Sequence, residues 1–224
     1  MKYSRNPDLE EELLDQMMDQ IRDDTRTQPS VTGMIRCLTR TYLDAEQPLP
    51  LNRQTKLYFS TGLAIERAIL VTQRGEDIKG TVDGVAYHFD SLSQDILREM
   101  KSTRIRANTK YGEYTPEKFS EHWLRQFRSY CKAANTTRIQ VCILHLIEPE
   151  LACWDVEFTQ EEIDENWEWI LSRAETYNAF VRLNKVPTPF RYNEGSSPDS
   201  WECKSCQNKI VCEAISAVGE THAS

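Results

Sequence analysis

The sequence predicts an α/β domain in which a short mixed β-sheet is flanked by helices. Helical periodicity dominates up to about residue 72, whereas segments rich in Val, Thr and aromatic residues follow from residue 78. Helix-start signals then frame a second pair of apolar segments. The resulting order of helices, strands, helix, strands and helix is typical of a sheet sandwiched between helical layers. At 224 residues the chain can bury a sizeable core.

Three helices are expected before the first strand. Residues 8–24 have apolar side chains at four-residue steps and acidic residues between them, which predicts an amphipathic helix (Leu9, Leu13, Met17, Ile21). Ser30 is placed to cap a second helix that runs to about residue 43 and contains Cys37. Beyond two prolines, a third helix is expected over residues 53–72.

The later elements alternate between strands and helices. Residues 78–89 predict one strand or a bent hairpin, and residues 96–103 predict the next strand. Thr115 is expected to cap a helix that runs to about residue 134, with Pro116 in its first turn. Strands are expected over 138–147 and 153–158, followed by a long helix to about residue 183 that opens with a capping box, Thr159 and Glu162. We therefore divide the chain into an acidic N-terminal helix (1–28), a core (29–190) and a cysteine-rich C-terminal segment (191–224).

The composition predicts a soluble protein without a membrane partner. Hydrophobic residues make up 39% and charged residues 28%, and no apolar run approaches the length of a membrane span. No secretory signal is evident at the N-terminus, so a cytoplasmic location is expected. The net charge of -8 argues against a nucleic-acid partner, but residues 98–138 hold ten Lys or Arg against four acids. This basic segment either binds phosphates or is an ordinary solvated helix face.

Two carboxylates and a lysine form a candidate reaction centre. Glu99 and Lys101 alternate along one strand and therefore project from the same face. Asp83 lies sixteen residues earlier, on a strand that could pair beside theirs and bring the three side chains together. Such carboxylates bind Mg²⁺ or Mn²⁺, which activates water, and a lysine orients that water or stabilises the transition state. Taken alone, Glu-x-Lys on a strand is more often an ordinary surface pattern.

Five weak motifs in order give that centre a context: Thr32-Gly-Met-Ile-Arg-Cys37, Gly62-Leu-Ala-Ile-Glu66, Gly80-Thr-Val-Asp83, Glu99-Met-Lys101 and Gln126-Phe-Arg-Ser-Tyr130. In order and spacing the chain resembles the RecB-like branch of the PD-(D/E)XK nucleases over most of its length. The resemblance implies a restriction-endonuclease-like core with Asp83, Glu99, Lys101, Gln126 and Tyr130 as catalytic residues. It also implies Glu66, Asp83 and Glu99 as metal ligands. The family commonly has His where Glu66 stands, so Glu66 is either a harder ligand for Mg²⁺ or a solvated helix residue. For Tyr130, packing on the sheet is the alternative.

The seven cysteines fall into two groups. Cys203, Cys206 and Cys212 form C-x2-C-x5-C in a polar tail, a spacing that favours a metal over a disulfide in a reducing compartment. The resemblance implies that they join Cys37 in holding a [4Fe-4S] cluster that connects the two ends of the domain, and zinc is the alternative. The remaining three are expected to be buried core thiols (Cys131, Cys142, Cys153).

The resemblance is nearest to the CRISPR-associated RecB-like nucleases. It implies a Mg²⁺- or Mn²⁺-dependent DNA exonuclease acting on single-stranded DNA or DNA ends, with a CRISPR integrase as partner in antiviral defence. Phage and recombination systems carry similar nucleases, and the chain has no Walker A pattern, so a helicase would be a separate partner. The alternatives are a non-catalytic DNA- or partner-binding module that keeps the nuclease fold and, less simply, a zinc-ribbon regulator.

Overall fold

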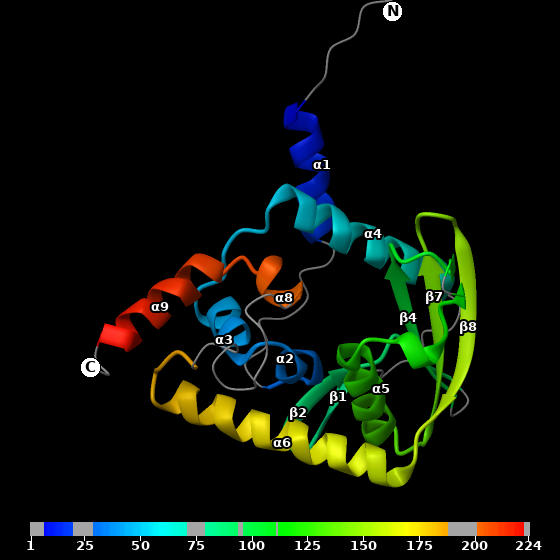
Figure 1. Cartoon of the computed structure of the whole chain (residues 1–224). Coiled ribbons are helices and arrows are strands. Elements are labelled where there is room, and N and C mark those ends of the chain that lie inside the picture. Colours follow the sequence, from blue (N-terminus) through cyan, green and yellow to red (C-terminus); the bar gives the residue numbers. More distant parts are fainter. Residues whose placement is uncertain are drawn as a thin grey trace, which may run out of the picture.

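The computed structural model describes residues 7–19, 29–70, 79–93, 96–110, 112–187 and 201–221. Its centre is a mixed sheet with the strand order β3-β4-β7-β8. The strands are β3 (Ser91–Ser93), β4 (Ile96–Thr103), β7 (Arg138–His145) and β8 (Glu150–Glu157). The β4–β7 pair is parallel, whereas β3–β4 and β7–β8 are antiparallel. The predicted short mixed sheet flanked by helices is confirmed (Figure 1).

Helices α5 (Glu121–Ala133) and α6 (Gln160–Arg182) lie side by side and share the main core with the sheet. Val141 and Ile143 of β7 belong to that core, as do Phe127 of α5 and Ile170 of α6, all of them fully buried. The predicted capping box at the start of α6 is confirmed. The start of α5 differs from the prediction: Thr115 precedes only a 3₁₀ turn (Pro116–Lys118), and Ser120 caps α5 through the Trp123 amide.

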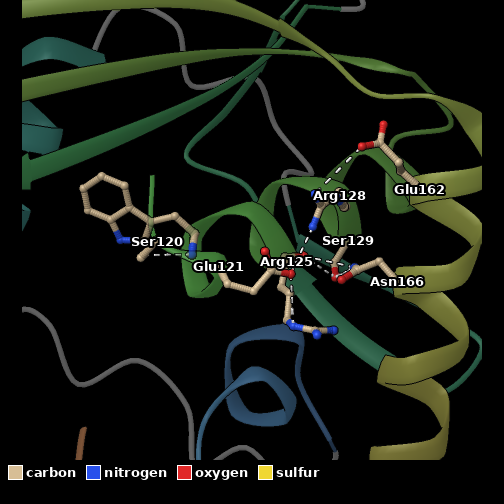
Figure 2. Close-up of polar contacts among 8 residues, drawn as sticks. Ser120, Glu121, Arg125, Arg128, Ser129, Glu162 and Asn166 are labelled. Carbon is tan, nitrogen blue, oxygen red and sulfur yellow. Dashed lines mark hydrogen bonds and ion pairs between the residues drawn. The ribbon is translucent and has the colours of Figure 1, made fainter. Parts of the chain in front are cut away.

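A polar network joins α5 to α6 within this core (Figure 2). The buried Asn166 amide donates to the Ser129 hydroxyl at 2.9 Å and to the Arg125 carbonyl at 3.1 Å. At the end of the interface Arg128 forms ion pairs with Glu121 and Glu162. These contacts hold the orientation of α5, whose other face points toward the sheet.

The second predicted helix is broken in two. Ser30 caps α2 (Val31–Ile35) as predicted, but α3 (Leu38–Glu46) begins only after Cys37, which stands at its N-cap instead of inside a helix. Arg173 of α6 explains the break, because its guanidinium donates to the carbonyl of Met34 at 2.5 Å and to that of Arg36 at 2.6 Å. In a continuous helix the Met34 carbonyl would accept from residue 38.

Helix α4 (Arg53–Leu70) agrees with the third predicted helix as far as residue 70, and residues 71–72 lie outside the described residues. Helix α1 (Pro7–Asp19) is the described part of the first predicted helix and packs on α4. The described contact includes ion pairs, since Lys56 binds Glu11 at 2.5 Å and Asp15 at 2.6 Å. None of the described helices is long and apolar enough to cross a membrane.

Strands β1 (Lys79–Val82) and β2 (Val85–His88) form a separate hairpin. Asp83 and Gly84 occupy its two-residue turn with φ of 49° and 78°, a conformation that suits an Asp-Gly pair. The prediction that the strand of Asp83 pairs beside that of Glu99 is therefore wrong, since the neighbours of β4 are β3 and β7.

Three smaller parts complete the described chain. A two-residue pair of strands, β5 (Asn108–Thr109) and β6 (Gly112–Glu113), precedes the 3₁₀ turn. The C-terminal segment contains α8 (Trp201–Lys204) and α9 (Lys209–Thr221). The amide of Cys37 donates to the Glu202 carboxylate at 3.0 Å, so α8 lies against the break between α2 and α3.

Candidate active site

A cavity of about 580 Å³ opens beside β4. Strand β3 pairs only with residues up to Arg98, so the β4 residues that follow face this cavity along one edge. Helix α4 contributes to the wall along with α2, β2 and α5. The cavity thus gathers residues from five elements at the point where β4 continues beyond its pairing with β3.

Four of the predicted catalytic residues meet in this cavity. The Lys101 ammonium donates to Glu99 Oε1 at 2.5 Å and to Gln126 Oε1 at 3.0 Å. The Gln126 amide in turn donates to the Tyr130 hydroxyl at 2.8 Å. Alternation along β4 and a four-residue step along α5 place these side chains together, as their spacing predicted. The structure brings them together, while their catalytic roles stay predictions.

Glu99 has a buried oxygen that accepts no hydrogen bond. The residue is 1% exposed, and its Oε2 has no donor among the described residues. Burial raises the pKa of this carboxyl to about 8; the Lys101 charge opposes the rise, and the Asp90 carboxylate adds to it. Two neighbouring carboxylates in one cavity, one of them with an oxygen that accepts no hydrogen bond from the described residues, are the kind of ligand that a hard divalent cation prefers. The residues present therefore fit Mg²⁺ or Mn²⁺.

Asp90 is a site residue that the sequence reasoning missed. It lines the cavity, and its Oδ2 accepts from the Met100 amide at 2.8 Å. A signal existed in the strand register: Ser91 is opposite Arg98 in the antiparallel β3–β4 pair, so the residue before Ser91 lies next to Glu99. His88, at the end of β2, also lines the cavity and was likewise not predicted.

The structure does not bring Asp83 into this group. Its carboxylate lies in the β1–β2 turn and accepts from the Trp167 indole at 2.8 Å, and it is not among the residues that line the cavity. Glu66 lies in α4, one turn after the cavity residue Gly62, but its side chain falls outside the described residues. In the described part of the chain, no three His, Cys, Asp or Glu side chains are placed to share one metal ion.

The four predicted cluster ligands lie in neighbouring segments. Cys37 is buried at the α2–α3 break, while Cys203, Cys206 and Cys212 of the adjoining C-terminal segment are partly exposed. Burial raises the pKa of the Cys206 thiol, and Cys37 is close enough to raise it further. The donors suit a thiolate-bound metal, but their sulfur atoms are not gathered around a common point.

The other three cysteines follow the prediction only in part. Cys131 and Cys142 are buried, and burial raises the pKa of both thiols to about 12. Cys153 is exposed, so its assignment to the core was wrong. It lies on β8, the edge strand of the sheet, where alternate side chains point away from the core.

The basic segment is largely compensated by acids from other elements. Lys132 pairs with Asp164, Arg138 with Glu157 and Arg106 with Glu148, at 2.7 to 3.3 Å. These pairs favour the ordinary solvated surface over a dedicated phosphate-binding face for much of the segment. Lys101 and Arg104 remain near the cavity, where Arg104 stacks on Tyr58.

Comparison with known proteins gives a likeness of fold. No family model and no curated protein matches the sequence. Among solved structures, the crystal structure of SSO0001 matches with a TM-score of 0.55 at 16% identity, covering 92% of this chain and 96% of that one. A phage-related exonuclease from Haemophilus somnus 129PT matches with a TM-score of 0.47 at 10% identity, covering 69% of this chain and 83% of that one. The first likeness extends to the fold, and the second carries no conclusion on function.

Proposed function

We propose that the chain is a DNA nuclease that hydrolyses phosphodiester bonds with Mg²⁺ or Mn²⁺, on a restriction-endonuclease-like core of the RecB-like type. The observation that carries the proposal is the buried Oε2 of Glu99, which accepts no hydrogen bond from the described residues, in an open cavity that Asp90 and Lys101 also line. A surface Glu-x-Lys pair would leave both side chains in water and would have no second carboxylate at its buried oxygen.

In this proposal Asp90 and Glu99 hold the divalent cation, and Glu66 is a further candidate ligand from α4. A cation bound there supplies an activated water and offsets the negative charge that develops on the phosphate. The Lys101 ammonium donates one hydrogen bond to Glu99 and one to Gln126, and these two bonds fix its direction. Its remaining N–H bond is available to a phosphate oxygen or to the attacking water.

Gln126 and Tyr130 act as positioning residues for that lysine. The Gln126 amide oxygen accepts from Lys101 and its nitrogen donates to Tyr130, which fixes the amide's orientation. Burial raises the pKa of the Tyr130 hydroxyl, so the hydroxyl stays protonated and can accept without becoming an anion. Tyr130 also packs edge-on against Phe89, so its ring contributes to the core while its hydroxyl accepts from Gln126.

The experiment compares cleavage of labelled single-stranded and duplex DNA in Mn²⁺ by the native protein and by variants. Lys101→Ala and Asp90→Asn are each expected to lower the rate at least about a hundredfold. Asp83→Asn is the matched control: its amide oxygen still accepts from Trp167, and the rate should stay near native. If Asp83→Asn abolishes cleavage while Asp90→Asn does not, Asp83 is the metal ligand, as the Gly80–Asp83 motif implies, and Asp90 is not.

An inactive native protein that still binds DNA would support the non-catalytic module instead. If cleavage is observed, release of single nucleotides would identify an exonuclease, and internal cuts an endonuclease. We also propose a role in CRISPR adaptation with an integrase as partner, or in DNA processing with a separate helicase. Only the sequence motifs support these two partners.

We also propose that Cys37, Cys203, Cys206 and Cys212 hold a [4Fe-4S] cluster, with zinc as the alternative metal. The proximity of Cys37 to Cys206 and the hydrogen bond from Cys37 to Glu202 support it. The cluster would be structural, because these cysteines are not among the residues that line the cavity.

A further inference from the structure

Two exposed aromatic rings stand at the cavity beside the proposed reaction centre. Tyr58 and Phe59 of α4 are 46% and 41% exposed, and both line the cavity that contains Glu99 and Lys101. Neither ring is needed to hold the proposed cation or to orient Lys101. Large aromatic side chains left in water next to a polar site offer flat apolar surface to a ligand with flat faces.

A cation extends this aromatic surface. The Arg104 guanidinium, in the exposed bend that follows β4, lies 4.6 Å from the centre of the Tyr58 ring. A guanidinium stacked on an aromatic ring keeps its N–H groups free to face outward in its own plane. The Tyr58–Phe59 side of the cavity wall, together with the adjoining Arg104, therefore combines planar apolar surface with a positive charge, the two properties that match the bases and phosphates of a nucleic-acid strand.

We propose that Tyr58, Phe59 and Arg104 form a stacking platform for an unpaired nucleobase of the strand whose phosphodiester enters the Glu99–Lys101 centre. The inference rests on the proposed function and deepens it by assigning Tyr58, Phe59 and Arg104 as the residues that select an unpaired strand. In a duplex each base is already stacked on its neighbours, so its face is closed to the platform. An unpaired base exposes that face, and the platform thereby selects single-stranded DNA or a frayed end.

The test measures binding without cleavage. Lys101→Ala protein, with no added divalent cation, is titrated into a fluorescein-labelled oligothymidylate, and fluorescence anisotropy reports the Kd. Adding Tyr58→Ala or Phe59→Ala is expected to weaken binding about tenfold, as loss of one base–aromatic stack does. Tyr58→Phe keeps the ring and should bind as the parent does. Leu57→Ala is the matched control, because Leu57 is 39% exposed on the same helix but does not line the cavity.

A second probe isolates the bases from the phosphates. An oligonucleotide of the same length with abasic residues should bind the parent protein more weakly, and Tyr58→Ala should cause no further loss with it. Arg104→Ala should weaken binding of oligothymidylate, whereas Arg106→Ala, whose side chain pairs with Glu148 nearby, should not.

The platform is overturned if Tyr58→Ala and Phe59→Ala leave the Kd unchanged in a folded protein, or if duplex DNA of the same length binds as tightly. It is also overturned if abasic and normal probes bind equally. These outcomes differ from failure of the proposed function: base-dependent binding by a native protein that cleaves no DNA would refute hydrolysis and leave the platform in place.

Discussion

At the scale of single residues, Glu99 is the buried carboxyl that needs a bound proton or cation to neutralise its charge. One carboxylate oxygen is bound to Lys101, and the other is buried without a donor among the described residues, while the nearby Asp90 carboxylate raises the pKa of Glu99 further. A buried charged oxygen is costly unless a proton or a cation neutralises it. In the metal-free protein the proton does so, because burial raises the pKa of Glu99 to about 8, and a divalent cation would replace that proton.

This predicts a specific pH dependence of stability. Native Glu99 keeps its proton up to about pH 8, whereas in the unfolded chain it is lost near the ordinary value of 4.5. The native state therefore binds more protons in this window, and the free energy of unfolding of the metal-free protein should fall as pH rises through it, on the order of a few kcal/mol. Urea denaturation between about pH 5 and pH 8 measures this.

The control is Glu99→Gln, whose amide does not titrate and which should lack this part of the pH dependence. In the native protein Mg²⁺ or Mn²⁺ should raise stability more near pH 8 than near pH 6, since at lower pH the ion competes with the proton. Parallel pH profiles for the native protein and Glu99→Gln would show that the carboxyl is not the titrating group.

The limits of prediction also show at this scale. Glu99 and Lys101 share a face because strands alternate, and Gln126 and Tyr130 share one because helices repeat every four residues, so local spacing suffices for both pairs. Asp90 depends on the register between β3 and β4, which a motif does not reveal. The Gly80–Asp83 motif directed attention to a carboxylate that instead binds Trp167, across eighty-four residues of sequence.

At the scale of elements, the break between α2 and α3 is the feature that local sequence concealed. No proline between Ser30 and Leu43 stops a helix, and the break coincides with the contacts of the buried Arg173 side chain, far along the chain in α6. By contrast, β4 and the capping box of α6 were predicted at their observed positions, because alternation and capping are local properties. Tertiary contacts such as those of Arg173 can interrupt a helix that the local sequence favours.

Replacement of Arg173 should therefore remove two buried hydrogen bonds at once. Arg173→Met keeps the apolar stem but leaves the Met34 and Arg36 carbonyls without the donor, and the free energy of unfolding is expected to fall by about 2–4 kcal/mol. Arg182→Met, an exposed position in the last turn of the same helix, should change it by less than about 0.5 kcal/mol. Equal effects of the two substitutions in urea denaturation would show that Arg173 does not hold the break.

At the scale of the whole molecule, residues from the last quarter of the chain contact α3 and its N-cap. Cys37 contacts Glu202 and Asp44 accepts from Asn208, while the Thr39 hydroxyl donates to the Pro187 carbonyl. These contacts span most of the sequence, so a cluster at this point would close a very long loop. Closing a long loop removes entropy from the unfolded chain and stabilises the fold.

Anaerobically purified protein should accordingly be brown, with iron and sulfide present and a broad visible absorption band. Cys206→Ser should lose the band and lower the Tm by roughly 5 °C or more. Cys153→Ser, an exposed cysteine outside the proposed set, is the matched control and should keep both. Colourless protein with stoichiometric zinc would replace the cluster by the zinc alternative, and metal-free protein with an unchanged Tm would refute both.

The attachment of α1 to α4 has a consequence of a different kind. Figure 1 shows α1 standing out from the rest of the molecule above α4, and Leu9 and Leu13 of this helix are exposed. Three ion pairs among the described residues join the two helices: on α4, Lys56 pairs with Glu11 and Asp15 of α1, and Arg53 pairs with Glu11. Mobile ions screen such exposed charges, over about 8 Å at physiological ionic strength and about 3 Å in molar salt. We therefore expect added salt to weaken these ion pairs between α1 and α4, whereas the apolar core around the sheet does not depend on such screening.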